Sequence, residues 1–334
     1  MHPARDRHTD TVAILLSVYN GEKYLQTQLE SLLNQTYRDW ILLWRDDGSS
    51  DGSRNIVERF AELIGTERCQ EIADTGHHVG AMRSYMTLLH MAEGYPLVAL
   101  ADQDDAWMDH KLARAVASLG PMPDEPASLY CARQIVVDEY LSRPSGSIRF
   151  RRTPGFPHAL VQNIATGCTI VLNRQAVELI NSFNPPASSF HDWWCYIVVS
   201  AAGGRIIADD EPVILYRQHR SNAIGLARSP VGRAIKACSR GPGSFVDQLK
   251  MHVTALQRQK HLLPALSCRE LDAVASALAG SPMAWAPLVL SGRLRRRNWL
   301  ETIALVFWLS LGAGFGDMRP AHQPGRRDVI APLQ

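Results

Sequence analysis

The strongest constraint on the fold is an alternation between short apolar runs and segments of helical periodicity, which begins at Val12. VAILLSVYN (12–20) is an almost unbroken apolar run, which is typical of a strand covered on both faces. Residues 22–35 then place leucines at helical spacing, and WILLWRDD (40–47) is a second apolar run. Because parallel strands need a helix-sized connection, this alternation predicts an α/β fold with a mostly parallel sheet flanked by helices.

The alternation continues along the chain, with less regular segments in between. Asp51 is the predicted N-cap of a helix that runs through Phe60. Prolines recur between residues 121 and 157, which indicates an irregular region. The further elements that we expect are a weak strand near 71–74, a helix at 80–92, a strand at 97–102, a helix at 110–119, a strand at 163–174, a helix at 190–202 and a strand or hairpin at 205–219.

The C-terminal third is predicted to form a separate helical appendage. Its apolar run WLETIALVFWLSLGAGFG (299–316) contains Glu301 and is shorter than the ~20 residues of a spanning helix, so a full crossing is not expected. The arginine-rich GRLRRRNW (292–299) precedes the run, and basic residues are attracted to anionic lipid surfaces. An interfacial helix and a helix packed on the α/β domain both remain open. The expected parts are disordered residues 1–11, an α/β domain over 12–228 and a helical region over 229–334.

Composition excludes several classes of protein. The chain carries 35 basic and 33 acidic residues, for a net charge of +2. Its overall charge therefore does not favour binding to nucleic acid. Its 6 cysteines form no C-x-x-C pair, which favours reduced thiols over a disulfide framework or a zinc site. The polar start MHPARDRHTD lacks the apolar segment of a secretory signal. We therefore expect a cytoplasmic protein, with any membrane contact at the cytoplasmic face of the inner membrane.

Two acidic clusters follow predicted strands, Asp46-Asp47 and Asp102-Gln-Asp104-Asp105. Parallel sheets bind ligands at the carboxyl ends of their strands, so the clusters could meet over one crevice. Like charges repel, and the D-x-D spacing turns two carboxylates to one side, so the pattern favours a shared cation. Oxygen ligands suit Mg²⁺ or Mn²⁺, and Mg²⁺ is usually held together with substrate phosphates. A solvated acidic turn or a helix cap is the alternative interpretation.

The order of these motifs resembles a known family. SVYNGEKYLQTQLESLLNQTYRDWILLWRDDGSSDGS, followed by LVALADQDDAW, closely resembles the family 2 glycosyltransferases, which are nucleotide-sugar enzymes with the GT-A fold. HDWWCYIVVSAAGGRIIADDEPVILYRQHRSNAIG resembles the branch of rhamnosyltransferases and related O-antigen or exopolysaccharide enzymes. The resemblance covers residues 12–226. It implies an inverting transfer of a sugar, rhamnose in this branch, to a glycan or lipid-linked acceptor in cell-surface polysaccharide synthesis.

The resemblance also assigns a nucleotide site. It implies that Asp47 accepts a hydrogen bond from the pyrimidine base, with Tyr19, Asn20 and Asp102 also at the nucleotide. Uracil and thymine both present an imide N–H, so the donor could be a UDP-sugar or a dTDP-sugar. Asp46 and Asp47 could instead serve the turn alone, because Asp-Gly sequences favour tight turns.

For the metal, the resemblance implies Mn²⁺ or Mg²⁺ held by Asp104, with Asp102 near the ribose or the metal and Asp105 behind them. His219, in YRQH, matches a position from which many GT-A enzymes supply a histidine to the same metal. The cation would neutralise the departing diphosphate. Outside the resemblance, a lone histidine is more often a surface or core residue.

The catalytic base implied by the resemblance is Asp192, which would take the proton of the acceptor hydroxyl. The usual family motif is Glu-Asp, and His191 stands in the first position here. As an alternative, Asp192 could cap the apolar helix that it opens. Trp193 could stack on a sugar while at least one of Trp193 and Trp194 is core, and Gly167 resembles the glycine of the loop beneath the donor and acceptor sugars.

Two other functions remain to be weighed. A metal-dependent phosphohydrolase would also use clustered aspartates, but it needs neither the Asp-Asp-Gly-Ser turn nor His-Asp-Trp-Trp. A catalytically inactive module that binds a nucleotide sugar would be favoured by loss of Asp104 or Asp192, and both are present. The sequence therefore favours a glycosyltransferase of the EC 2.4 class.

Overall fold

The computed structural model describes residues 11–73, 77–120, 125–142, 144, 150, 155–219, 245–296 and 299–314, and all structural statements concern these ranges. The predicted disorder of residues 1–11 lies outside them except for Thr11. The basic stretch 148–152 is described only at Phe150, and residues 220–244 and 315–334 are not described.

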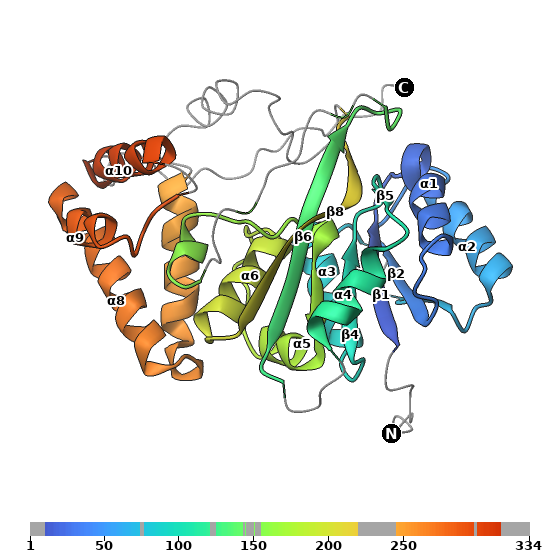
Figure 1. The fold of residues 1–334 in the computed structure, drawn as a ribbon, viewed down its shortest axis with the longest axis horizontal. Helices are drawn as coiled ribbons and strands as arrows, with labels where there is room; N and C mark the ends of the chain where they lie inside the picture. Colours follow the sequence, from blue (N-terminus) through green and yellow to red (C-terminus); the bar gives the residue numbers. More distant parts are fainter. Residues whose placement is uncertain are drawn as a thin grey trace, which may run out of the picture.

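The first half of the chain forms the predicted parallel sheet (Figure 1). β1 pairs in parallel with β2 and β4, and β2 pairs in parallel with β3. The third strand begins two residues earlier than predicted, because Cys69 is aligned with Leu42 of β2. The elements are β1 (Val12–Val18), α1 (Glu22–Leu33), β2 (Trp40–Asp46), α2 (Ser53–Ile64), β3 (Cys69–Glu71), α3 (Ala81–Met91) and β4 (Leu97–Ala101).

One predicted cap is wrong by one residue. The N-cap of α2 is Gly52 rather than Asp51. Asp51 Oδ1 still accepts from the backbone N and the hydroxyl of Ser53, and its Oδ2 accepts from the backbone N of Glu22. Asp51 therefore joins the starts of two helices, from a position just before the cap.

The second half completes an eight-stranded sheet in the order β3-β2-β1-β4-β7-β6-β8-β5. β6 and β8 are parallel to each other, whereas β7 and β5 run antiparallel to their neighbours. The elements are β5 (Ala106–Trp107), α4 (Lys111–Leu119), β6 (Ser128–Val137), η1 (His158–Leu160), η2 (Gly167–Thr169), β7 (Val171–Asn173), α5 (Arg174–Asn181), α6 (His191–Ala201) and β8 (Arg205–Arg217).

The prediction of a strand at 163–174 is wrong for most of these residues. Only Val171–Asn173 pair as a strand, and Gly167–Thr169 form a short 3-10 helix. The Thr169 hydroxyl and backbone N both donate to the carbonyl of Thr166, which closes a turn where the apolar pattern indicated extended chain. This turn places Gly167 in the candidate site.

Alternating residues of β1 divide the core into two layers. Ala13 and Leu15 belong to the apolar cluster on the side of α3, α5 and α6, whereas Val12, Ile14 and Leu16 belong to the cluster with α1, α2 and α4. All five side chains are fully buried. Helices therefore cover both faces of the sheet, as predicted for a parallel arrangement.

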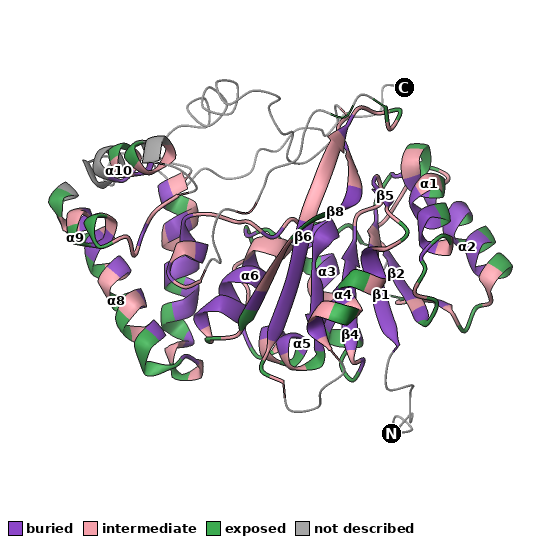
Figure 2. Ribbon diagram, viewed as in Figure 1, coloured by how far each residue is buried: buried purple, intermediate pink, exposed green. Residues whose placement is uncertain are grey.

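The C-terminal helices extend the α6 side of the molecule (Figure 1). Leu249 and Val253, on a helix over residues 245–258, share one buried cluster with Trp194 of α6. Figure 2 shows buried residues on the inner faces of these helices. Among the helices of the described ranges, none combines the length and apolar character that a membrane crossing requires. The further elements are η3 (Lys260–Leu262), α8 (Ala265–Ala279), η4 (Pro282–Trp285), α9 (Ala286–Leu290) and α10 (Trp299–Gly314).

Candidate functional site

A cavity of about 1200 Å³ opens at the carboxyl ends of β1, β2, β4 and β8. These strands end at one edge of the sheet, so residues far apart in sequence converge there. Phe190, His191 and Thr166 add a second wall from α6 and the turn before η2. The predicted site residues in its lining are Tyr19, Asn20, Asp47, Asp102, Asp104, Gly167, Asp192 and His219.

The turn after β1 is held against the turn after β4 by Gln103. The Gln103 side chain accepts from Tyr19 N at 2.8 Å and donates to Tyr19 O at 2.9 Å. Gly21 lets this side chain approach, since a Cβ there would overlap the Gln103 amide. The ring of Tyr19 is 42% exposed and lies 4.1 Å from the ring of His78, centroid to centroid. Sequence reasoning missed Gln103 and His78, because neither has a motif of its own.

Asn20 braces the turn that follows β2. Its backbone has φ 47°, in the left-handed region that asparagine tolerates better than most residues. Its side-chain oxygen accepts from Ser50 N at 2.8 Å, and its backbone N donates to the Ser49 hydroxyl at 3.0 Å. Asn20 therefore links the loops that follow the first two strands.

Asp47 lies in a buried ion pair at one side of the cavity. Its Oδ1 is 2.6 Å from Arg45 Nη1, and the two side chains are 2% and 1% exposed. Val79 N and Gly80 N also donate to the carboxylate, at 2.9 and 2.8 Å. Burial alone would raise the pKa of Asp47, but these donors outweigh it and lower the pKa. Asp47 is therefore a fixed carboxylate, and a hydrogen bond from a base would add to those already formed.

The acidic turn after β4 places its three carboxylates in different surroundings. Burial, then the nearby charges of Asp104 and Asp192, raise the pKa of Asp102 to about 7. Asp104 Oδ2 lies 2.8 Å from Nε2 of His219. Asp105 is fully buried, and its Oδ1 accepts from Arg217 N at 3.0 Å. The third carboxylate thus ties the turn to the end of β8.

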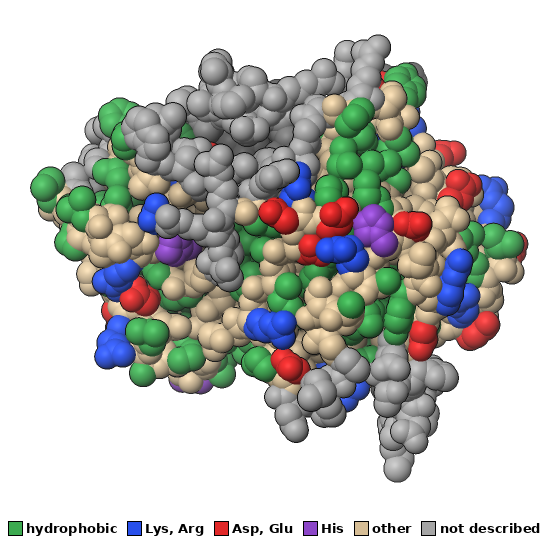
Figure 3. Space-filling view, viewed as in Figure 1, with side chains coloured by type: hydrophobic (Ala, Val, Ile, Leu, Met, Phe, Trp, Pro, Cys, Tyr) green, Lys and Arg blue, Asp and Glu red, His purple; other side chains and the backbone are tan. Residues whose placement is uncertain are grey.

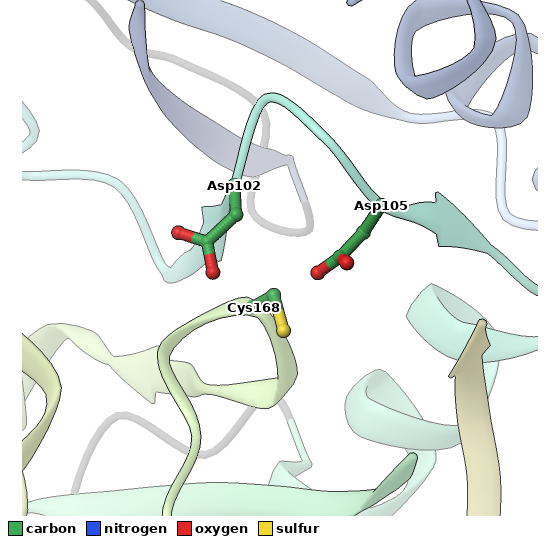
Figure 4. Close-up of side chains that lie close together, drawn as sticks. All are labelled: Asp102, Asp105 and Cys168. Carbon is green, nitrogen blue, oxygen red and sulfur yellow. The ribbon is translucent and has the colours of Figure 1, made fainter. Parts of the chain in front are cut away.

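Two groups of side chains could be considered for a cation. Asp102, Asp105 and Cys168 place ligand atoms within 4.8 Å of one another (Figure 4). Cys168 is fully buried, and burial raises the pKa of its thiol, so the sulfur stays protonated and is a poor ligand for a hard cation. Asp102 and Asp104 offer hard oxygens, and His219 brings an imidazole nitrogen to Asp104. By the chemistry of their donor atoms, these three residues suit Mg²⁺ or Mn²⁺ better than the group that contains Cys168.

Asp192 lies in the first turn of α6, and the N-cap of that helix is Phe190. Its Oδ2 accepts from Gly167 N at 3.2 Å and from Asn163 Nδ2 at 3.1 Å. Burial raises the pKa of Asp192 to about 6, although these hydrogen bonds oppose the shift. The position at the helix start therefore does not prevent the pKa of Asp192 from rising. At neutral pH, a carboxyl group with this pKa is still largely ionised.

The aromatic residues beside Asp192 have separate environments. Trp194 is fully buried, as one of the pair was predicted to be. Trp193 donates its indole N–H to Ala159 O at 2.6 Å and packs edge-on against His252, so its ring lies behind the cavity wall. Phe190 is 40% exposed and lines the cavity. Stacking of Trp193 on a sugar stays a prediction, whereas Phe190 is the one of these three aromatic residues that lines the cavity.

Comparison with known proteins agrees with this geometry. The model of the family described as Glycosyl transferase family 2 matches residues 13–178. The dTDP-rhamnosyl transferase RfbG of Shigella flexneri is 26% identical over 218 residues, which cover 63% of this chain and 73% of RfbG. The Escherichia coli enzyme WfgD, a UDP-Glc:alpha-D-GlcNAc-diphosphoundecaprenol beta-1,3-glucosyltransferase, is 27% identical over 194 residues, which cover 56% of this chain and 69% of WfgD.

Solved structures share the fold at lower identity. TarS 1-349 of S. aureus in complex with UDP has a TM-score of 0.56 at 14% identity, and covers 96% of this chain and 94% of its own. The mannosyltransferase PcManGT of Pyrobaculum calidifontis, in complex with GDP-Man and Mn²⁺, has a TM-score of 0.50 at 19% identity, and covers 92% and 86%. The sheet order and the family match confirm the resemblance first seen in the strand-end motifs: the chain is an enzyme of glycosyltransferase family 2, with a GT-A fold.

Proposed function

We propose that the enzyme is an inverting transferase that moves a sugar from a nucleoside-diphosphate donor to a hydroxyl of a glycan or lipid-linked acceptor. The observation that carries the proposal is the position of Asp192, held by Gly167 N and Asn163 in the same cavity as Asp102 and Asp104. With a pKa of about 6, the Asp192 carboxylate can accept a hydroxyl proton at neutral pH. The acceptor oxygen would attack the anomeric carbon as the nucleoside diphosphate leaves.

The cation-binding residues in this proposal are Asp104, Asp102 and His219. When bound, Mg²⁺ or Mn²⁺ would offset the negative charge that develops on the departing diphosphate. Asp105 holds the acidic turn in register with β8 through Arg217 N. The Arg217 guanidinium donates to the backbone carbonyl of Asp104 at 2.7 Å, so the same residue holds the Asp105 carboxylate and the backbone of the acidic turn.

For the donor, we infer a UDP-sugar or a dTDP-sugar. Tyr19 supplies an exposed ring at the edge of the cavity, and Asp47 supplies a carboxylate below it. Rhamnose is supported by the similarity to RfbG, and glucose by the similarity to WfgD. The name of WfgD also supports a diphosphoundecaprenol-linked acceptor and hence a role in cell-surface polysaccharide synthesis.

A lipid-linked acceptor would require the enzyme to work beside a membrane, and we infer a peripheral contact through the C-terminal helices. On α10, Leu305 and Leu309 are buried while Ile303 and Phe307 are 58% and 60% exposed. Leu290, which ends α9, is 86% exposed. Figure 3 shows hydrophobic side chains at this end of the molecule, over α9 and α10. One face of α10 therefore packs on the neighbouring C-terminal helices α8 and η4, and another face offers apolar side chains.

Flotation with vesicles of phosphatidylglycerol and phosphatidylethanolamine tests the membrane contact. The wild type should float with the vesicles, and the double variant Ile303→Ser/Phe307→Ser should float several-fold less. Leu266→Ser is the matched control, because Leu266 is 63% exposed on α8. Equal flotation of all three proteins, or none by the wild type, would contradict the membrane contact but not the transfer reaction.

The transfer itself is tested by incubating the enzyme with Mn²⁺, labelled dTDP-rhamnose or UDP-glucose, and GlcNAc-diphosphoundecaprenol. We expect label to enter the lipid fraction from one of the donors. A metal-dependent phosphohydrolase would instead release nucleotide at the same rate without the lipid. An inactive binding module would bind the donors and leave them intact.

A further inference from the structure

The imidazole of His191 occupies a prepared position in the cavity wall. Its ring stacks on Tyr85 with centroids 3.9 Å apart and planes 17° apart. Gly167 also lies next to the ring, and a Cβ there would be only 2.8 Å from His191 Nε2. Because an alanine would crowd the ring at that distance, the missing side chain of Gly167 leaves room for the imidazole.

The imidazole of His191 carries a buried polar atom without a hydrogen-bond partner. His191 Nε2 is buried and makes no hydrogen bond to any part of the chain that the structure describes. His191 nevertheless lines the cavity. A polar atom in such a position is stabilised when a bound ligand supplies the missing hydrogen bond.

The neighbours of His191 locate it within the reaction. The hydroxyl of Tyr85, on which the ring stacks, lies 3.2 Å from Asp102 Oδ1, on the side of the proposed metal. Gly167, which also lies next to the ring, donates its backbone N–H to Asp192, the proposed base. The sugar of a bound donor must lie between the diphosphate and the acceptor hydroxyl. His191 therefore lies between the proposed metal site and the proposed base, beside the place that this sugar would occupy.

The electrostatics of the wall indicate which sugars fit. Asp102 and Asp192 line the same cavity as His191, so a sugar that carries a carboxylate would be repelled. Burial lowers the pKa of His191 to about 3, so the ring is neutral and offers no compensating positive charge. A neutral imidazole can exchange one hydrogen bond with a hydroxyl.

We propose that His191 is a donor-specificity residue, which hydrogen-bonds through Nε2 to a hydroxyl of the uncharged sugar that the enzyme transfers. This proposal rests on the proposed function and assigns a residue that recognises the sugar of the donor. A glutamate, the usual family residue at this position, would add a third charge beside Asp102 and Asp192. Histidine keeps a polar contact at this position and adds no charge.

Calorimetric titration of UDP, UDP-glucose, dTDP and dTDP-rhamnose in Mn²⁺ tests this inference. His191→Phe keeps a ring that can stack on Tyr85 and removes both nitrogens. This variant should bind the sugar nucleotide about tenfold more weakly, which is the contribution of one neutral hydrogen bond. Its affinity for UDP or dTDP should change less than about twofold. His191→Gln, which restores an amide near the Nε2 position, should recover most of the loss.

The control is His90→Phe, because His90 lies on α3 outside the cavity with its side chain 73% exposed. If His191→Phe does not fold, His191→Leu provides the same comparison. Equal losses of sugar-nucleotide and diphosphate affinity, or no recovery in His191→Gln, would overturn the role of His191. Failure of the wild type to bind any nucleotide sugar would instead overturn the proposed function itself.

Discussion

Nε2 of His219 lies 2.8 Å from Oδ2 of Asp104, although the two residues are 115 positions apart in the chain. The contact arises because β8 and β4 end at the same edge of the sheet, with β8 running parallel to β6. The ring of Tyr24 packs on the imidazole, with centroids 4.6 Å apart, which restricts its orientation. The two side chains that we propose as metal ligands are thus held next to each other.

Replacement of Asp104 should abolish metal-dependent nucleotide binding. We expect Asp104→Asn to bind UDP with Mn²⁺ no better than without it, because the carboxylate that faces His219 is lost. His219→Ala should weaken the Mn²⁺ effect about tenfold. Calorimetric titration with and without the metal measures both effects. Asp109→Asn, an exposed carboxylate outside the cavity, is the control, and an unchanged Mn²⁺ requirement in Asp104→Asn would refute the metal assignment.

Asp47 should contribute to stability as well as to binding. Asp47→Asn removes the carboxylate that pairs with the buried Arg45, which should lower the free energy of unfolding by about 3–5 kcal/mol. Asp272→Asn, in an exposed pair with Lys260, should cost less than about 1 kcal/mol. Urea denaturation compares the two variants, and equal effects would argue against a special role of the buried pair.

The lowered pKa of Asp47 also sets the sign of its pH dependence. The stabilisation is fully present above the unfolded pKa of about 3.8, and it is lost as pH falls through the lower folded value. The stability difference between wild type and Asp47→Asn should therefore be constant from pH 6 to 8 and shrink below about pH 4.

Gly167→Ala should impair transfer without unfolding the protein. The new methyl group would lie 2.8 Å from His191 Nε2 and would displace the imidazole or the turn that donates to Asp192. We expect kcat/KM to fall at least tenfold. Gly155→Ala is the matched control, because, chain neighbours aside, no atom of the described ranges lies within 4 Å of a Cβ at that position. Wild-type kinetics in Gly167→Ala would show that this wall tolerates a side chain and would argue against the close fit described here.

The rate of transfer should follow the ionisation of Asp192. Because a base must be deprotonated to act, kcat should rise about tenfold per pH unit below pH 6 and level off above it. In Asp192→Asn this rise should disappear. A wild-type profile that is flat between pH 5 and 8 would exclude Asp192 as the group that limits the rate.

Much of the fold could be predicted because its strands are buried on both faces. Val12–Val18 and Leu97–Ala101 are apolar runs in the sequence and central strands in the sheet. The carboxyl ends of such strands share one edge, so the meeting of Asp47 and Asp102 at one cavity follows from topology alone.

The remaining features depend on contacts that no local pattern encodes. β7 is three residues long, and the turn at Gly167 is set by hydrogen bonds to Thr166 rather than by apolar periodicity. Gln103 acts through the backbone of Tyr19, which is distant in sequence. The appendage, predicted to be separate, shares a core with α6, and its buried His252 hydrogen-bonds to the Ser189 hydroxyl at 2.8 Å. Helical periodicity shows that a face is apolar but not which surface it covers.

In the proposed reaction, Asp192 takes a proton from an acceptor hydroxyl while a nucleoside diphosphate leaves. The most direct measurement is nucleoside diphosphate release from dTDP-rhamnose and UDP-glucose with Mn²⁺, with and without a lipid extract that contains diphosphoundecaprenol-linked glycans. We expect release to require the extract, and Asp192→Asn to bind the donor within about twofold of wild type but to turn over about 100-fold more slowly. Release at the same rate without the extract, or wild-type turnover by Asp192→Asn, would contradict it.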